Sequence, residues 1–193
     1  MANDMEIPKL AARTALPAAL RVLLDDYPRE GWEAHPRFTG LVQFWLERHQ
    51  LFRQLSDVLN DDAEAMLDRR IEARKYAGRL SQYGGMMINQ LHGHHQIEDQ
   101  HYFPTLQGLD KRLSRGFEML DRDHPAMGGL LDRFATAANE VLGVLENPDR
   151  LTDATGAFRD EAQGFAALLR RHLSDEEDLI VPVILHHGPA GLV

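Results

Sequence analysis

The chain of 193 residues contains no cysteine. Disulfide bridges, zinc-thiolate centres and thiol catalysis are therefore excluded together. Any metal site has to be built from imidazole nitrogen and from oxygen ligands. Histidine, by contrast, occurs ten times, so the histidines are the first place to look for chemistry.

Basic charge and long apolar runs are also scarce. Lys and Arg total 21 against 30 Asp and Glu, for a formal charge of −9, which disfavours nucleic acid as a partner. The longest apolar stretch, Leu179 to Leu185, contains Pro182 and is far shorter than the roughly 20 residues of a spanning helix. The first residues lack a basic leader followed by an apolar run. We expect a soluble, cytoplasmic protein with no membrane partner.

Strand-like alternation of β-branched residues is nearly absent, and apolar residues instead recur at spacings of three and four. This pattern occupies four segments: Phe38 to Leu59, Leu80 to Glu98, Leu113 to Ala138 and Phe158 to Val183. It predicts an all-α, antiparallel, up-down four-helix bundle. We expect a single domain over residues 1–193, with the bundle core at about 36–186 and an N-terminal extension at 1–35 that forms an additional helix from Leu10 to Tyr27.

Two stretches of the chain repeat one spacing of residue types. HHQIEDQHYFP, residues 94–104, and HLSDEEDLIVP, residues 172–182, each place a histidine, a glutamate four residues later and a proline six residues after that. Residues i and i+4 share one face of a helix, so the histidine and glutamate of each stretch should project from the same helix face and be able to reach a common point. Helices tend to end before proline, which predicts that both pairs lie in the last two turns.

Each pair follows a lone histidine in the preceding apolar stripe. His49 precedes His94 by 45 residues, and His124 precedes His172 by 48, so the chain has the pattern of a tandem duplication. Buried imidazoles and carboxylates without partners are costly, and cations bound by both groups remove that cost. The predicted ligands of two metal ions are His49, His94, Glu98, His124, His172 and Glu176.

Several neighbouring residues carry weaker signals. Asp121 or Asp123 is a candidate to accept a hydrogen bond from His124 and fix its tautomer, although a charged helix surface explains both residues equally well. Asp99 and Glu177 are expected to be solvated, unless a shift of the helix register by one residue turns them toward the ligands. His101 fits a further ligand, a proton relay or an ordinary histidine at a helix end, and His95 fits an outer contact or a surface position. For His49 the alternative is a core histidine bonded to backbone.

The six residues and the YFP and IVP helix ends resemble the hemerythrin-like, or HHE cation-binding, domains over roughly residues 36–186. The resemblance implies a centre of two iron ions with an oxo or hydroxo bridge inside a four-helix bundle. The chain departs from the oxygen carriers, because Gly128 stands where they have a second histidine and the last helix carries HxxxE in place of HxxxxD. The pattern is more similar to bacterial di-iron members tied to oxidative or nitrosative stress.

The resemblance implies a protein that binds and reacts with dioxygen, peroxide or nitric oxide. No side chain stands out as a nucleophile or general base, so no catalytic residue is predicted and the chemistry would belong to the metals. Whether the protein is a peroxide- or NO-reactive oxidoreductase stays open, and the alternatives are a non-catalytic iron or oxygen sensor or store, and a helical scaffold with coincidental histidines. A monomer or homodimer is expected.

Overall fold

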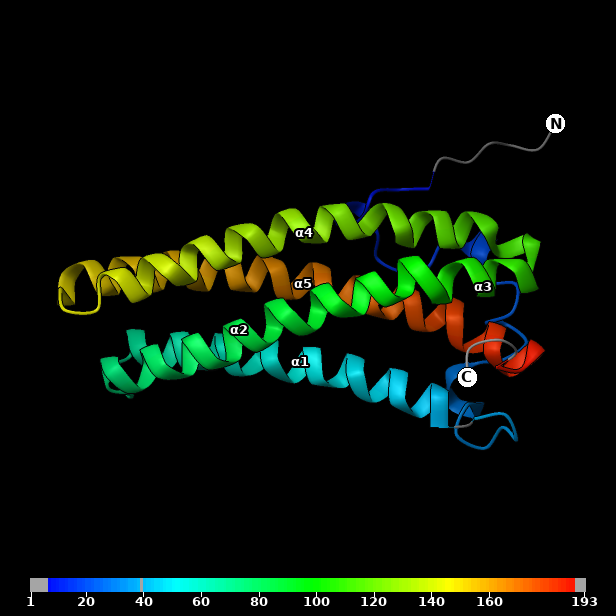
Figure 1. Cartoon of the computed structure of the whole chain (residues 1–193), viewed down its shortest axis with the longest axis horizontal. Helices are drawn as coiled ribbons and strands as arrows, with labels where there is room; N and C mark the ends of the chain where they lie inside the picture. The colour runs from blue at the N-terminus through cyan, green and yellow to red at the C-terminus, as the bar shows by residue number, and fades with distance from the viewer. Residues whose placement is uncertain (1–6, 39, 190–193) are drawn as a thin grey trace. The chain divides into compact units, whose positions relative to one another are not determined.

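The computed structural model describes residues 7–38 and 40–189 of the chain, and in these ranges it contains helices and turns without a strand. The all-α bundle class predicted from the sequence is confirmed. Four long helices dominate, together with a π-helical turn at Glu98–Tyr102 and the short helix α3 (Figure 1). The α-helices are α1 Gly40–Leu67, α2 Ala73–Ile97, α3 Phe103–Leu109, α4 Ser114–Gly143 and α5 Pro148–His187.

The described residues fall into two compact units. The first unit comprises residues 7–38, 40–48, 96–125 and 170–189, and the second comprises 49–95 and 126–169. Each unit has a buried core of its own, and the two are described separately below.

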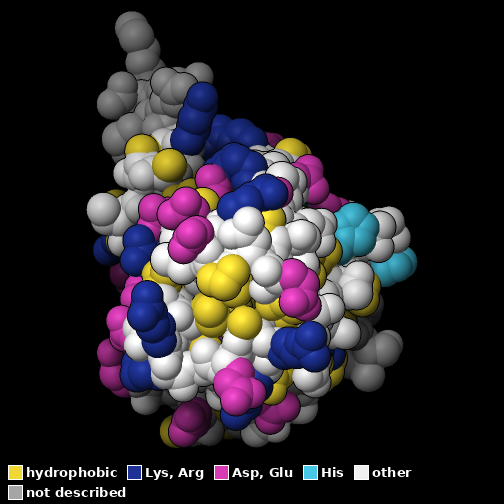
Figure 2. Space-filling model, turned by 90° about the vertical axis from the view of Figure 1, so that its left-hand side faces the viewer, with side chains coloured by type: hydrophobic (Ala, Val, Ile, Leu, Met, Phe, Trp, Pro, Cys, Tyr) yellow, Lys and Arg dark blue, Asp and Glu magenta, His cyan; other side chains and the backbone are white. Residues whose placement is uncertain are grey.

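The second unit contains two helical hairpins. The chain leaves α1 at Leu67, turns through Arg69 with a φ of 58°, and enters α2 at Ala73, so the charged stretch 61–78 forms this turn and its two flanking helix ends. Asp62 of α1 accepts a bond from Arg79 Nε of α2 at 2.6 Å. In the other hairpin, the ring of Phe134 on α4 lies 5.2 Å from that of Phe158 on α5. Acidic and basic side chains intermingle on the face shown in Figure 2.

The first unit has a core of leucines and aromatic rings to which the N-terminal segment contributes. This segment was predicted to form a helix from Leu10 to Tyr27, but it forms separate 3₁₀ turns, two of them at Leu10–Ala12 and Ala18–Leu20. Pro17, which lacks an amide hydrogen and restricts the residue before it, interrupts any longer helix. Leu16, Leu20 and Leu23 are nevertheless buried, so the apolar stripe was read correctly although its backbone conformation was not.

The two prolines of the repeat do not end their helices. Pro182 lies inside α5, which continues to His187, and Pro104 lies in the first turn of α3, directly after the π-helical turn. An interior proline costs about 3 kcal/mol through the lost hydrogen bond and the clash with the preceding turn. All residues from Leu179 to Leu185 are buried, and burial of such side chains contributes roughly 1.5–3 kcal/mol each. The burial therefore outweighs the local cost of the proline.

None of the helices in the described ranges is both long and apolar enough to cross a membrane.

Replacing Phe134 with alanine should destabilise the protein by about 3–5 kcal/mol, because the deleted ring leaves a cavity between α4 and α5. The ring is 1% exposed and also lies 5.6 Å from Phe165. Urea unfolding followed by circular dichroism measures the change. Phe44→Ala is the matched control, since that ring is 53% exposed, and it should shift stability by less than about 0.5 kcal/mol. Equal effects of the two substitutions would contradict this account of the core.

Candidate metal centre

Two glutamates lie close together inside the first unit. Glu98 in the π-helical turn and Glu176 in α5 are both 0% exposed, and a carboxylate oxygen of one lies within 4.8 Å of an oxygen of the other. Burial, followed by the negative charge of Glu176, raises the pKa of Glu98 well above its ordinary value. Two carboxylates in this position need protons or a cation before both can be accommodated.

Two histidines of the same unit face these carboxylates. His124 Nε2 lies 3.6 Å from Glu98 Oε2, and His172 Nε2 lies 3.7 Å from Glu176 Oε2. A ring nitrogen of one histidine lies within 4.8 Å of a ring nitrogen of the other. Burial, with a further contribution from His172, lowers the pKa of His124, which favours the neutral imidazole that metals bind. The first unit thus brings together four of the six predicted ligands.

The remaining two predicted ligands pair in the second unit. Nε2 of His49 on α1 and Nε2 of His94 on α2 are 3.2 Å apart, and the ring of Phe52 lies 5.2 Å from the His94 ring. His49 is fully buried. Two imidazole nitrogens at this distance either share a proton or face a common ligand.

The outer contacts of the histidines differ from those predicted. His124 Nδ1 bonds Asp99 Oδ1 at 2.7 Å, whereas Asp123 Oδ2 lies 3.6 Å from Nδ1 of His172 and Asp121 is exposed. Asp99 was expected to be solvated, and its side chain is indeed 39% exposed, but one oxygen reaches the ring. The i→i+5 bonding of the π-helical turn alters which side chains face inward relative to a regular α-helix, and heptad-like spacing does not anticipate this.

Tryptophan supplies a contact that the sequence analysis missed. Trp45 on α1 belongs to the first unit, is 4% exposed, and donates its indole N–H to Glu176 Oε1 at 2.8 Å. The apolar stripe identified Trp45 only as a core residue. A buried indole N–H almost always finds an acceptor. The position of Trp45 one turn before His49 was therefore the available indication that this N–H could bond a residue of the predicted metal site.

A buried arginine lies in the next layer of the first unit. Arg13 bonds both oxygens of Asp123 and donates Nε to Asp175 Oδ2 at 2.9 Å. Burial alone would raise the pKa of Asp123, but His172 and Arg13 together outweigh it and hold the pKa below its usual value. Sequence reasoning missed Arg13 and Asp175, because partners 162 residues apart leave no local pattern.

Glu177, His101 and His95 differ in their exposure to solvent. Glu177 was expected to be solvated but is 3% exposed, and it accepts a bond from Arg29 Nη1 at 2.9 Å, which satisfies the buried carboxylate. His101 is exposed in the π-helical turn, which favours an ordinary histidine over a further ligand, and His95 is half-buried.

The donor groups fit a transition-metal ion. Neutral imidazole nitrogens and carboxylate oxygens are the ligands that iron and similar ions take in helical bundles. The first unit provides two of each in buried positions, and a cation supplies the positive charge that Glu98 and Glu176 require. Fold and donor set together define a helical bundle of the cation-binding class.

Comparison with known families agrees with this class. The family model of the hemerythrin HHE cation-binding domain matches residues 40–184, which is 145 of the 193 residues. The chain belongs to this family, and its His and Glu groups can bind metal. The family resemblance found in the sequence is thereby confirmed. Searches of curated proteins and of solved structures gave no match.

Glu98→Gln should stabilise the metal-free protein at neutral pH. Because the folded-state pKa of Glu98 is raised, the folded state holds a proton that the unfolded state releases above about pH 4.3. The free energy of unfolding therefore falls as pH rises from there through the raised pKa. The substitution removes this loss. Thermal unfolding in the presence of chelator, measured from pH 4 to pH 8, follows the effect.

Glu118→Gln, which changes an exposed glutamate on α4, is the control and should leave the pH dependence unchanged. Identical pH profiles for wild type and Glu98→Gln would show that the buried carboxylate is not under strain.

Proposed function

We propose that the protein holds two iron ions and that this centre reacts with a small oxygen or nitrogen species. The proposed ligands are the six predicted residues: His49, His94, Glu98, His124, His172 and Glu176. When bound, iron supplies electrons and Lewis acidity toward dioxygen, peroxide or nitric oxide. The donor set and the family resemblance support this choice of substrates, and the biological setting proposed is an oxidative or nitrosative stress response.

One observation carries the proposal. Within the first unit, two buried His–Glu pairs stand at 3.6 Å and 3.7 Å, and their carboxylates approach within 4.8 Å. A single buried pair is satisfied by sharing a proton. Two pairs whose carboxylates adjoin also gather four metal-binding side chains in one buried region, and this donor set supports the proposal of two cations.

Side chains around these pairs have defined tasks in the proposed centre. Asp99 accepts from Nδ1 of His124, which leaves Nε2 of that ring as the metal-binding atom. Trp45 fixes one oxygen of Glu176 and so restricts its rotation. Phe103 stacks on His124 with centroids 5.4 Å apart, and this apolar wall keeps water from one side of the ring.

Among residues 7–38 and 40–189, no side chain beside the pairs stands out as a nucleophile or general base. In the proposed centre these residues would bind, orient and exclude water, and the bound ions would carry the redox chemistry. The metal centre serves equally well in turnover and in reversible binding. The reactivity of the iron-loaded protein toward peroxide and nitric oxide therefore decides whether it is an enzyme, a sensor or a store.

Iron analysis with absorption spectroscopy on aerobically purified protein tests the proposal. We expect about two irons per chain, as in other di-iron bundles, and a ligand-to-metal band in the visible range. His172→Ala combined with Glu176→Gln should remove both, while Glu118→Gln should retain both. Zinc alone, or iron unaffected by the double substitution, would overturn the assignment.

Addition of peroxide or nitric oxide to the iron-loaded protein separates the two classes of function. Repeated consumption of peroxide or nitric oxide beyond the iron content identifies an enzyme or protective sink. Uptake that stops at the iron content identifies a binding module such as a sensor or store.

A further inference from the structure

The N-terminal segment lies outside the 40–184 match to the family, yet it places a charged group deep in the first unit. The Arg13 side chain is 1% exposed. A buried guanidinium is tolerated only where several acceptors surround it. The position of this arginine therefore calls for an explanation in terms of its partners.

Those partners are two buried aspartates on different helices. Arg13 bonds both oxygens of Asp123 on α4 and donates Nε to Asp175 on α5. Its Nη1 also donates to the Pro8 carbonyl at 3.2 Å, which ties the segment to itself. Arg171 approaches the other oxygen of Asp175 at 2.7 Å, so two arginines balance the charge of two aspartates.

Both aspartates adjoin proposed ligands in the sequence. Asp123 directly precedes His124, and Asp175 directly precedes Glu176. Asp123 Oδ2 also faces Nδ1 of His172 at 3.6 Å. A carboxylate at this distance from Nδ1 favours, through its negative charge, the tautomer with the proton on that nitrogen, and this tautomer leaves Nε2 for a metal. This Nε2 is the atom that faces Glu176.

We propose that Arg13 is a positioning residue of the metal centre: by holding Asp123 in place, it fixes the orientation and tautomer of His172. The N-terminal segment is then a working part of the centre. The ligand role of His172 comes from the proposed function, on which the inference rests, but the state of its ring can be measured without metal.

Nitrogen-15 NMR of the histidine rings in metal-free protein tests the proposal directly. Wild type should show His172 with its proton on Nδ1, and Arg13→Ala should show a mixture of tautomers. Arg21→Ala is the matched control, because Arg21 lies in the same segment and bonds only the Leu16 carbonyl among the contacts seen for it. It should leave the His172 signals unchanged.

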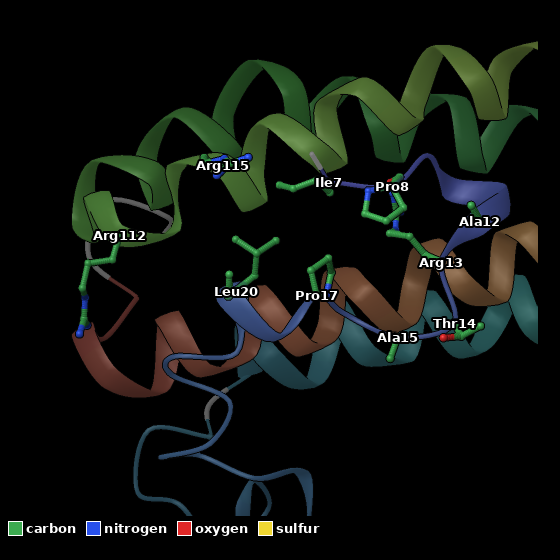
Figure 3. Close-up of a pocket in the computed structure, with 11 residues that line it drawn as sticks. Ile7, Pro8, Ala12, Arg13, Thr14, Ala15, Pro17, Leu20, Arg112 and Arg115 are labelled. Atoms are coloured by element: carbon green, nitrogen blue, oxygen red, sulfur yellow. The ribbon is translucent and has the colours of Figure 1, made fainter. Parts of the chain in front are cut away.

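A pocket beside Arg13 allows a chemical rescue. The pocket has a volume of about 440 Å³, and it is lined by Arg13 together with Pro8, Pro17 and Leu20 (Figure 3). Truncation of Arg13 opens the space next to Asp123 and Asp175 toward this pocket. Guanidinium ions at millimolar concentration should enter and restore the wild-type tautomer in Arg13→Ala, whereas urea, which is uncharged, should not.

If Arg13→Ala does not fold, Arg13→Lys carries the same test. Its single ammonium lacks the fork that spans two carboxylates, so mixed tautomers of His172 are again expected. A wild-type tautomer in whichever variant folds would overturn the proposal and leave Arg13 as a structural clamp.

Iron loading separates this inference from the function on which it rests. In the loaded protein, Arg13→Ala should shift the visible absorption band relative to Arg21→Ala while binding the same amount of iron. An unchanged band would contradict the positioning role. Failure of wild type to bind iron would instead overturn the proposed function, whatever the tautomer of His172.

Discussion

The structure depends on the accommodation of two carboxylates that share one buried space. Glu98 and Glu176 approach within 4.8 Å in the interior of the first unit, where each would resist ionisation in the presence of the other. The groups around these carboxylates place nitrogen atoms and a hydrogen-bond donor beside them. His124 and His172 provide nitrogen on one side, and Trp45 provides a donor to Glu176. The surrounding side chains thus prepare the carboxylates for a cation.

The sequence predicted the fold class and the pairing of His172 with Glu176, which lie 3.7 Å apart, because both depend on a rule that survives packing. Positions i and i+4 share a helix face wherever the helix is regular, so His172 and Glu176 could be paired on spacing alone. Helix ends depend on a weaker rule. Pro182 carries a local penalty, but the buried side chains on both sides of it keep α5 intact through that position. Tertiary burial decided the outcome there, and residue spacing does not report burial.

The outer contacts could not be predicted, for two physical reasons. The π-helical turn at Glu98–Tyr102 changes the direction of successive side chains, so Asp99, expected in solvent, reaches His124. Arg13 meets Asp123 across 110 residues of chain, and such a contact has no periodic signature. An arginine is also usually solvated, although the guanidinium of Arg13 is buried here.

Charge balance explains why this outer layer suits a metal centre. Arg13 and Arg171 offset Asp123 and Asp175, so this outer cluster is close to neutral although it contains four ionised groups. The buried carboxylates that face His124 and His172 are those of Glu98 and Glu176, which is where a cation is proposed. Were the outer aspartates left without arginines, they would also attract the cation, and its position would be less well defined. The neutrality of this outer cluster therefore helps to confine a bound cation to Glu98 and Glu176. Half of that neutrality comes from a segment outside the family match, so the matched domain alone does not account for the electrostatics of the site.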